Sequence, residues 1–67
     1  MNSNEIMKEC RVLAREQNLT FKRSENVGTI NGKACYNIES GIEYKTLHQG
    51  CLVTIWETLL SEALTGQ

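Results

Sequence analysis

The chain has 67 residues, contains no proline, and carries a formal net charge of −1 from seven Lys and Arg against eight Glu. Hydrophobic residues make up 40% of it, which is enough for one modest core and too many for a disordered tail. This size and composition exclude a multidomain enzyme, a membrane span and a strongly basic nucleic-acid-binding tail. We expect one small domain over residues 1–67, whose stability is marginal or is assisted by a partner chain.

An amphipathic helix is predicted at the start of the chain, from about Asn4, where Ser3 or Asn4 can cap the free N–H groups of the first turn. At 100° per residue its apolar residues fall within an arc of roughly 120°, which is typical of a helix with one buried face. That stripe consists of Ile6, Met7, Cys10, Leu13 and Ala14. Asn18 then suits the left-handed backbone conformation that ends many helices.

Strand signals follow the helix. Residues 19–23 alternate in polarity with a period of two, and residues 34–38 do so again. Between them, Asn31-Gly32 predicts a type I′ hairpin turn, because both central positions of that turn need a positive φ. We expect a bulge near residues 25–28 to adjust the register of this first hairpin.

A second hairpin is predicted at the three-residue loop Glu39-Ser40-Gly41, in which Gly41 would take the left-handed position. That loop would pair Ile38 with Ile42 and Tyr36 with Tyr44, and would place all four side chains on one face of the sheet. A two-residue loop would send the last two of them to the other face. The register therefore favours the longer loop.

A second helix is predicted from about Gly50 to Leu64, with Gly66 as its stop. Its apolar positions cover nearly 180°, which is wider than the roughly 100° that a surface helix needs. These positions are Leu52, Ile55, Trp56, Leu59, Leu60, Ala63 and Leu64. We expect the apolar edge formed by Val53, Leu60 and Leu64 to meet a second chain. In the alternative, the first helix packs along this edge and buries it within one monomer.

These elements predict an α+β fold of the order αβββα. Its most economical arrangement is a three-stranded antiparallel sheet with the N-terminal and C-terminal helices packed on one face. The other face of the sheet is then left to solvent or to a partner.

Residues that could carry catalysis are few. His48 is the only histidine, and the chain contains no Asp to orient it. A Cys–His pair with Cys51 is conceivable, but a loop histidine before a helix is more often a solvated or capping residue. Adding Cys35 and Cys10 would make four zinc ligands, but structural zinc sites usually consist of two tight ligand pairs. We therefore predict no catalytic, cofactor-binding or metal-binding residue, and a protein that is not an enzyme.

The expected location is the cytoplasm. Three cysteines without a CxxC pair suit free thiols in a reducing compartment. Residues 1–8 are polar and lack the apolar region of a signal peptide, and no apolar run approaches the roughly 18 residues that span a bilayer.

Basic residues gather in the first half of the chain. Residues 1–33 contain six basic and four acidic residues, whereas residues 34–67 contain one and four. Three bases of the first helix lie within roughly 60° of one another, opposite the apolar stripe. The predicted partner-binding set is Lys8, Arg11, Arg15, Lys22 and Arg23. Such a set suits docking to an acidic protein or to a phosphate backbone. The alternative is a solvated helix face.

Two short motifs stand before the closing helix: residues 18–22, NLTFK, and residues 30–36, INGKACY. In this order they resemble a loose group of short phage and prophage proteins that run helix, GLTFK, INGxxAY, turn, helix. Asn18 stands where that group often has glycine, and the acidic-basic turn after its second strand is reduced here to Glu39-Ser40-Gly41. The resemblance implies a phage or mobile-element accessory protein. Some short proteins of that origin bind and inhibit a host protein, including host-defence complexes, and the group supplies no catalytic residue.

The resulting expectation is a protein without cofactor that binds, and can inhibit, a larger host protein or host-defence complex in the cytoplasm of the host cell. The first alternative is a small nucleic-acid-binding regulator that uses the basic face of the first helix. The second alternative is a homodimer whose function lies in its assembly.

Overall fold

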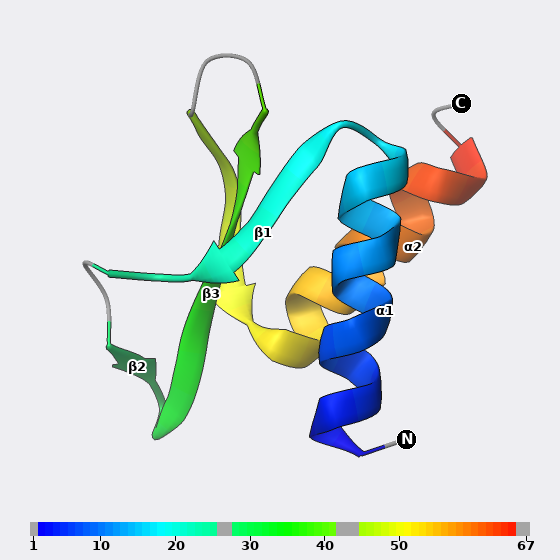
Figure 1. The fold of residues 1–67 in the computed structure, drawn as a ribbon. Helices are drawn as coiled ribbons and strands as arrows, with labels where there is room; N and C mark the ends of the chain where they lie inside the picture. Colours follow the sequence, from blue (N-terminus) through cyan, green and yellow to red (C-terminus); the bar gives the residue numbers. More distant parts are fainter. Residues whose placement is uncertain (1, 26–27, 42–44, 66–67) are drawn as a thin grey trace.

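The computed structural model describes residues 2–25, 28–41 and 45–65 (Figure 1). Its elements are α1 (Ser3–Glu16), β1 (Leu19–Arg23), β2 (Thr29–Ile30), β3 (Lys33–Ser40), β4 (Thr46–Cys51) and α2 (Leu52–Thr65). The predicted order of helix, strands and helix is confirmed, with the two-residue β2 as an added short strand.

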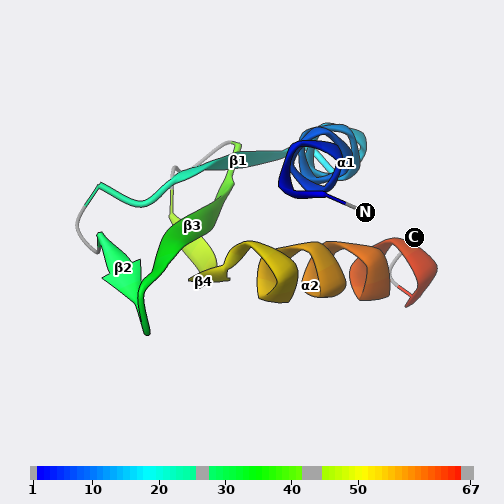
Figure 2. The ribbon, with the colours of Figure 1, turned by 90° about the horizontal axis from the view of Figure 1, so that it is seen from below.

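The strand β3 is the centre of the sheet. It pairs antiparallel with β1, with β4 and, through its first residues, with β2. Both helices lie on the same side of the sheet, with α1 beside β1 and α2 leading directly out of β4 (Figure 2). The predicted α+β arrangement, in which an antiparallel sheet is covered by the two helices, is therefore confirmed.

The pairing predicted for the second hairpin is wrong. β3 continues through Ser40, and it pairs Ile38 with His48 and Tyr36 with Gly50. The Ser40 N–H donates to the Lys45 carbonyl at 2.9 Å, so the strand that pairs with β3 begins further along the chain than predicted. The predicted partners at 42 and 44 lie outside the described residues. The next strand was missed because Thr46–Cys51 contains His, Gln and Gly and has no regular alternation of apolar residues.

The left-handed positions predicted at Asn18 and at the Asn31-Gly32 turn are confirmed, whereas the one predicted at Gly41 is wrong, because Gly41 has no positive φ. Asn18, which follows α1, has a φ of 60°, and the turn residues Asn31 and Gly32 have φ values of 51° and 79°. The N-cap lies earlier than predicted, because the Asn2 side chain accepts a hydrogen bond from the Glu5 N–H at 2.9 Å.

The core lies between the sheet and the two helices. Its buried residues are Ile6, Cys10 and Ala14 of α1, Ile38 of β3, and Ile55 and Leu59 of α2. Two polar contacts also join the helices. The Trp56 Nε1–H donates to Glu9 Oε1 at 3.1 Å, and the Gln17 amide donates to the Leu59 carbonyl at 3.2 Å. These contacts hold α1 against α2 on one flank, so the opposite flank of α1 faces β1.

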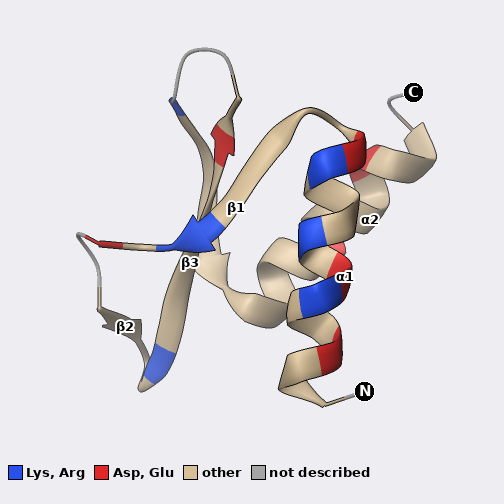
Figure 3. Cartoon of the chain, viewed as in Figure 1, with Lys and Arg blue, Asp and Glu red and all other residues tan. Residues whose placement is uncertain are grey.

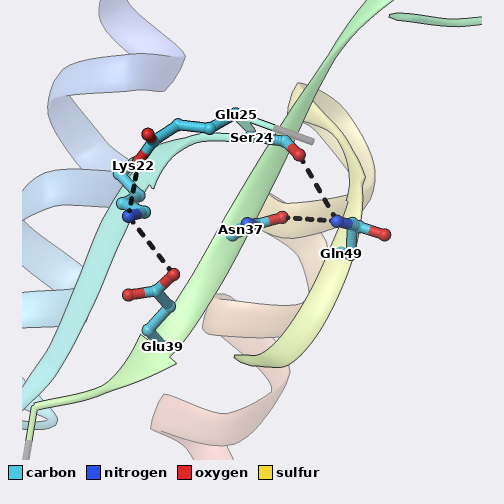
Figure 4. A network of polar contacts seen from close by, with 6 residues as sticks. All are labelled: Lys22, Ser24, Glu25, Asn37, Glu39 and Gln49. Atoms are coloured by element: carbon cyan, nitrogen blue, oxygen red, sulfur yellow. Dashed lines mark hydrogen bonds and ion pairs between the residues drawn. The ribbon is translucent and has the colours of Figure 1, made fainter. Parts of the chain in front are cut away.

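The sheet face that points away from the helices carries a row of polar residues. Lys22, Asn37 and Gln49 stand opposite one another on β1, β3 and β4 (Figure 4). The Gln49 amide donates to Asn37 Oδ1 at 2.9 Å and to Ser24 Oγ at 3.4 Å. Asn37 and Ser24 are both buried, so these hydrogen bonds satisfy groups that have lost water.

A candidate docking groove between α1 and β1

An open groove of about 530 Å³ runs between α1 and β1. It forms where the chain leaves α1 at Asn18 and turns into β1, so its two walls come from segments that are adjacent in the sequence. Its lining residues are Arg11, Ala14, Arg15, Asn18, Leu19, Thr20, Phe21 and Gly41.

The charge of the groove comes from Arg11 and Arg15, which stand one helical turn apart on the wall formed by α1. Both side chains are exposed, and none of the described residues that line the groove is acidic. Among the described residues, neither arginine makes an ion pair. Like charges four residues apart slightly destabilise a helix, so the folding of α1 gains nothing from this pair. Figure 3 shows basic residues along α1 on the same side of the molecule as β1.

The floor of the groove is apolar. Leu19 and Phe21 belong to the helix-facing side of β1, because Phe21 stands directly opposite the core residue Ile38. The Phe21 ring stacks on Tyr36 with centroids 5.3 Å apart and an angle of 9° between the planes. This stack fixes the Phe21 ring at the boundary between the core and the groove, where it stays half-buried.

The other three residues of the predicted partner-binding set do not line this groove. Lys22 is on the opposite face of β1, where its ammonium lies 3.1 Å from Glu25 and 3.5 Å from Glu39. The hydrogen bond with Glu25, together with the charge of Glu39, raises the pKa of Lys22 above its ordinary value. Lys8 lies nearer the start of α1, beside Val12, and the exposed Arg23 ends β1. Two of the five predicted bases therefore share one recess.

Apart from Arg11 and Arg15, none of the residues that line the groove was predicted from the sequence as a binding residue. Asn18 was identified only as a helix terminator and Gly41 only as a hairpin residue. A Cβ on Gly41 would come within 2.7 Å of the Asn18 carbonyl oxygen, so the glycine allows the end of β3 to approach the turn after α1. A glycine required by such a contact leaves no signal in a single sequence.

His48 and Cys51 do not form a pair. They lie three residues apart on β4 and so point to opposite faces of the sheet. His48 Nε2 lies 3.2 Å from Glu62 Oε2 of α2, whereas the Cys51 sulfur contacts Thr54 Oγ1 at 3.2 Å. Within residues 2–25, 28–41 and 45–65, no three metal-ligating side chains come together.

The predicted apolar edge of α2 is only partly exposed. Val53 is 47% exposed and Leu64 is 86% exposed, whereas Leu60 is partly buried. The exposed Glu57 lies between Val53 and Leu60 at helical spacing, so a charge interrupts the stripe. The role of this edge in self-association stays a prediction.

No helix in the described part of the chain is long and apolar enough to cross a bilayer. Comparison of the chain with family models, with curated proteins and with solved structures finds no match in any of the three.

Proposed function

We propose that this chain is a small binding protein whose groove between α1 and β1 holds an acidic segment of a larger protein. The observation that supports this proposal is the pair Arg11 and Arg15, exposed and without ion pairs among the described residues, above a half-buried apolar floor. Arginine presents several N–H donors in a planar fork that matches a carboxylate, so two such side chains favour an anionic ligand.

An acidic protein segment fits the groove better than a nucleic acid does. A protein that binds a phosphate backbone usually places a row of basic side chains along it. Lys22 cannot extend such a row from the groove, because it lies on the other face of β1 and already makes ion pairs with Glu25 and Glu39. Sequence-tolerant binding of single strands also uses exposed aromatic rings as stacking platforms. Phe21 instead stacks on Tyr36 within the protein.

The test is a fluorescence-anisotropy titration of a labelled seven-residue peptide with Glu at alternate positions and Val between them. We expect Arg11→Glu/Arg15→Glu to weaken binding by at least about tenfold, because both arginine–carboxylate contacts become repulsive. The matched control is Lys33→Glu/Lys45→Glu, which makes the same change in net charge at two exposed positions outside the groove. We expect the control to change the affinity by less than about threefold.

Three results would overturn the proposal. The first is no binding of the acidic peptide at low salt. The second is an equal loss in both double variants, which would indicate attraction by net charge alone. The third is tighter binding of a DNA oligonucleotide, with a steep decrease in affinity as salt rises, which would favour the nucleic-acid-binding alternative.

The sequence pattern supports a more specific form of the proposal, in which the chain is a phage accessory protein and its partner is a host protein that it inhibits. The experiment is affinity purification from a bacterial host with the wild type and with both double variants. The supporting result is a host protein retained by the wild type and by Lys33→Glu/Lys45→Glu but lost with Arg11→Glu/Arg15→Glu. An acidic segment of that protein must then bind by itself with the same dependence on the two arginines.

A further inference from the structure

The strand β1 has an open edge beside the groove. β1 pairs with β3 on one side, and the described part of the chain supplies no strand on the other side. Its five residues pair with β3 without a register shift, so the open edge is regular over about 17 Å.

Two contacts show which residues of β3 direct their backbone N–H and C=O groups to β1 and which direct them to β4. The Cys35 carbonyl accepts from the Ser24 N–H at 2.9 Å on the β1 side, and the Ser40 N–H donates to Lys45 at 2.9 Å on the β4 side. Because backbone groups of successive residues point to opposite edges, odd-numbered residues of β3 bond to β1 and even-numbered residues bond to β4.

The backbone groups of β1 alternate between its two edges in the same way. Its even-numbered residues, Thr20 and Lys22, stand opposite Glu39 and Asn37 and bond to β3. Leu19, Phe21 and Arg23 therefore direct their N–H and C=O groups to the open edge. No hydrogen bond from another described residue reaches these groups. An edge of this kind is a template for pairing with another strand.

We propose that the acidic segment binds as an added strand, hydrogen-bonded to the backbone of Leu19, Phe21 and Arg23 at the open edge of β1. This inference rests on the proposed function and adds to it the conformation of the partner and the atoms that hold it. Strand addition of this kind obtains affinity from main-chain hydrogen bonds and specificity from alternate side chains. Here the alternate side chains on the helix side would reach Arg11 and Arg15.

The charges favour an acidic strand over a second copy of this chain. A second copy paired through its own β1 would bring its own Arg11 and Arg15 to the same edge, and the like charges would repel. The other exposed edge, on β4, is less suitable, because its pairing with β3 shifts register between Ile38 and Glu39 and such bulges interrupt edge pairing.

The side chains on the far face of the added strand would meet Thr20 and Lys22. Lys22 is the base that β1 places on that face, and its ammonium already lies near Glu25 and Glu39, so a second acidic row there would meet no unpaired base of β1. The inferred partner segment is therefore extended, with acidic residues at every second position and uncharged residues between them.

Amide hydrogen exchange measured by NMR tests the inference with the alternating Glu–Val peptide. We expect the amides of Leu19, Phe21 and Arg23 to exchange at least about tenfold more slowly in the complex, because they gain hydrogen-bond acceptors. The amides of Thr20 and Lys22 already bond to β3 and serve as internal controls, so their exchange should change much less. An equal change at all five amides, or no change at any of them, would overturn strand addition.

Backbone N-methylation of the peptide provides a second measurement. Two peptides carry methyl groups on every second amide. One peptide is methylated at the odd-numbered amides and the other at the even-numbered amides, and both keep the same side chains and charge. Strand addition predicts that one peptide loses at least about tenfold in affinity while the other changes by less than about threefold. Equal affinity of the two, with binding still lost in Arg11→Glu/Arg15→Glu, would overturn strand addition and leave the proposed function standing. Failure of the unmethylated peptide to bind would overturn both.

Discussion

Cys35 and Cys51 lie directly opposite each other on β3 and β4 as a pair that exchanges no backbone hydrogen bonds, since the backbone groups of Cys35 face β1. In pairs of this type the Cα atoms lie about 4.5 Å apart, which is inside the range of roughly 4.4–6.8 Å found in disulfides. Both thiols are free; Cys35 is buried and Cys51 is partly exposed.

Incubation with glutathione disulfide is expected to join these two cysteines. The Cys51 thiolate attacks the glutathione disulfide and releases one glutathione, and Cys35 then displaces the second glutathione. The product is an intramolecular disulfide and two reduced glutathiones, so intact-mass spectrometry should show a loss of about 2 Da. In Cys35→Ser the second step cannot occur, and the protein should retain one glutathione on Cys51. A stable glutathione adduct on the wild type would contradict the prediction.

The thiol of Cys51 should react with iodoacetamide before that of Cys10. The Thr54 hydroxyl, together with N–H groups of the first turn of α2, lowers the pKa of Cys51, whereas burial raises the pKa of Cys10 to about 11. A lower pKa means that the thiolate forms at a lower pH, so labelling of Cys51 should rise at a pH below that of an unperturbed cysteine. Thr54→Val should move this rise to higher pH, and Thr58→Val, one turn further along α2, should not. An identical profile in all three proteins would contradict the assigned cause.

Gly41→Ala is expected to destabilise the protein by about 1–3 kcal/mol, because the added methyl group would lie 2.7 Å from the Asn18 carbonyl oxygen. The affected carbonyl belongs to the backbone and cannot move without shifting the turn that ends α1. Urea denaturation measures the change. The control is Gly28→Ala, whose methyl group would meet no atom within 4 Å and should change stability by less than about 0.5 kcal/mol. Equal losses in the two variants would contradict a steric origin.

Glu9→Ala is expected to cost about 1–2 kcal/mol, because it leaves the part-buried Trp56 Nε1–H without the acceptor that now lies 3.1 Å away. Glu9→Gln keeps a side-chain oxygen and should recover part of the loss. The exposed Glu16 lies two turns further along α1, and Glu16→Ala serves as the control. Urea unfolding followed by Trp56 fluorescence measures all three variants. A loss in Glu16→Ala as large as that in Glu9→Ala would contradict a specific role for the contact.

Periodicity and turn chemistry were sufficient to predict most of the fold. The apolar stripe of α1 places Ile6, Cys10 and Ala14 in the core, and the left-handed turn positions depend on local backbone sterics. The strand Thr46–Cys51 was not predicted. Its pairing with β3 depends on the partner strand and on a bulge, and the apolar pattern of the segment indicates neither of them.

The sequence by itself determined the two helices, the Asn31-Gly32 turn and the basic character of the first half of the chain, because each depends on residues close together along the chain. Only the tertiary structure decided which bases act together. Arg11 and Arg15 line a groove with Phe21. Lys22 lies on the opposite face of β1, where it forms ion pairs with Glu25 and Glu39. The physical reason is the alternation of side chains across a strand, since the strand pairing determines which face meets the helices and which face meets the acidic side chains.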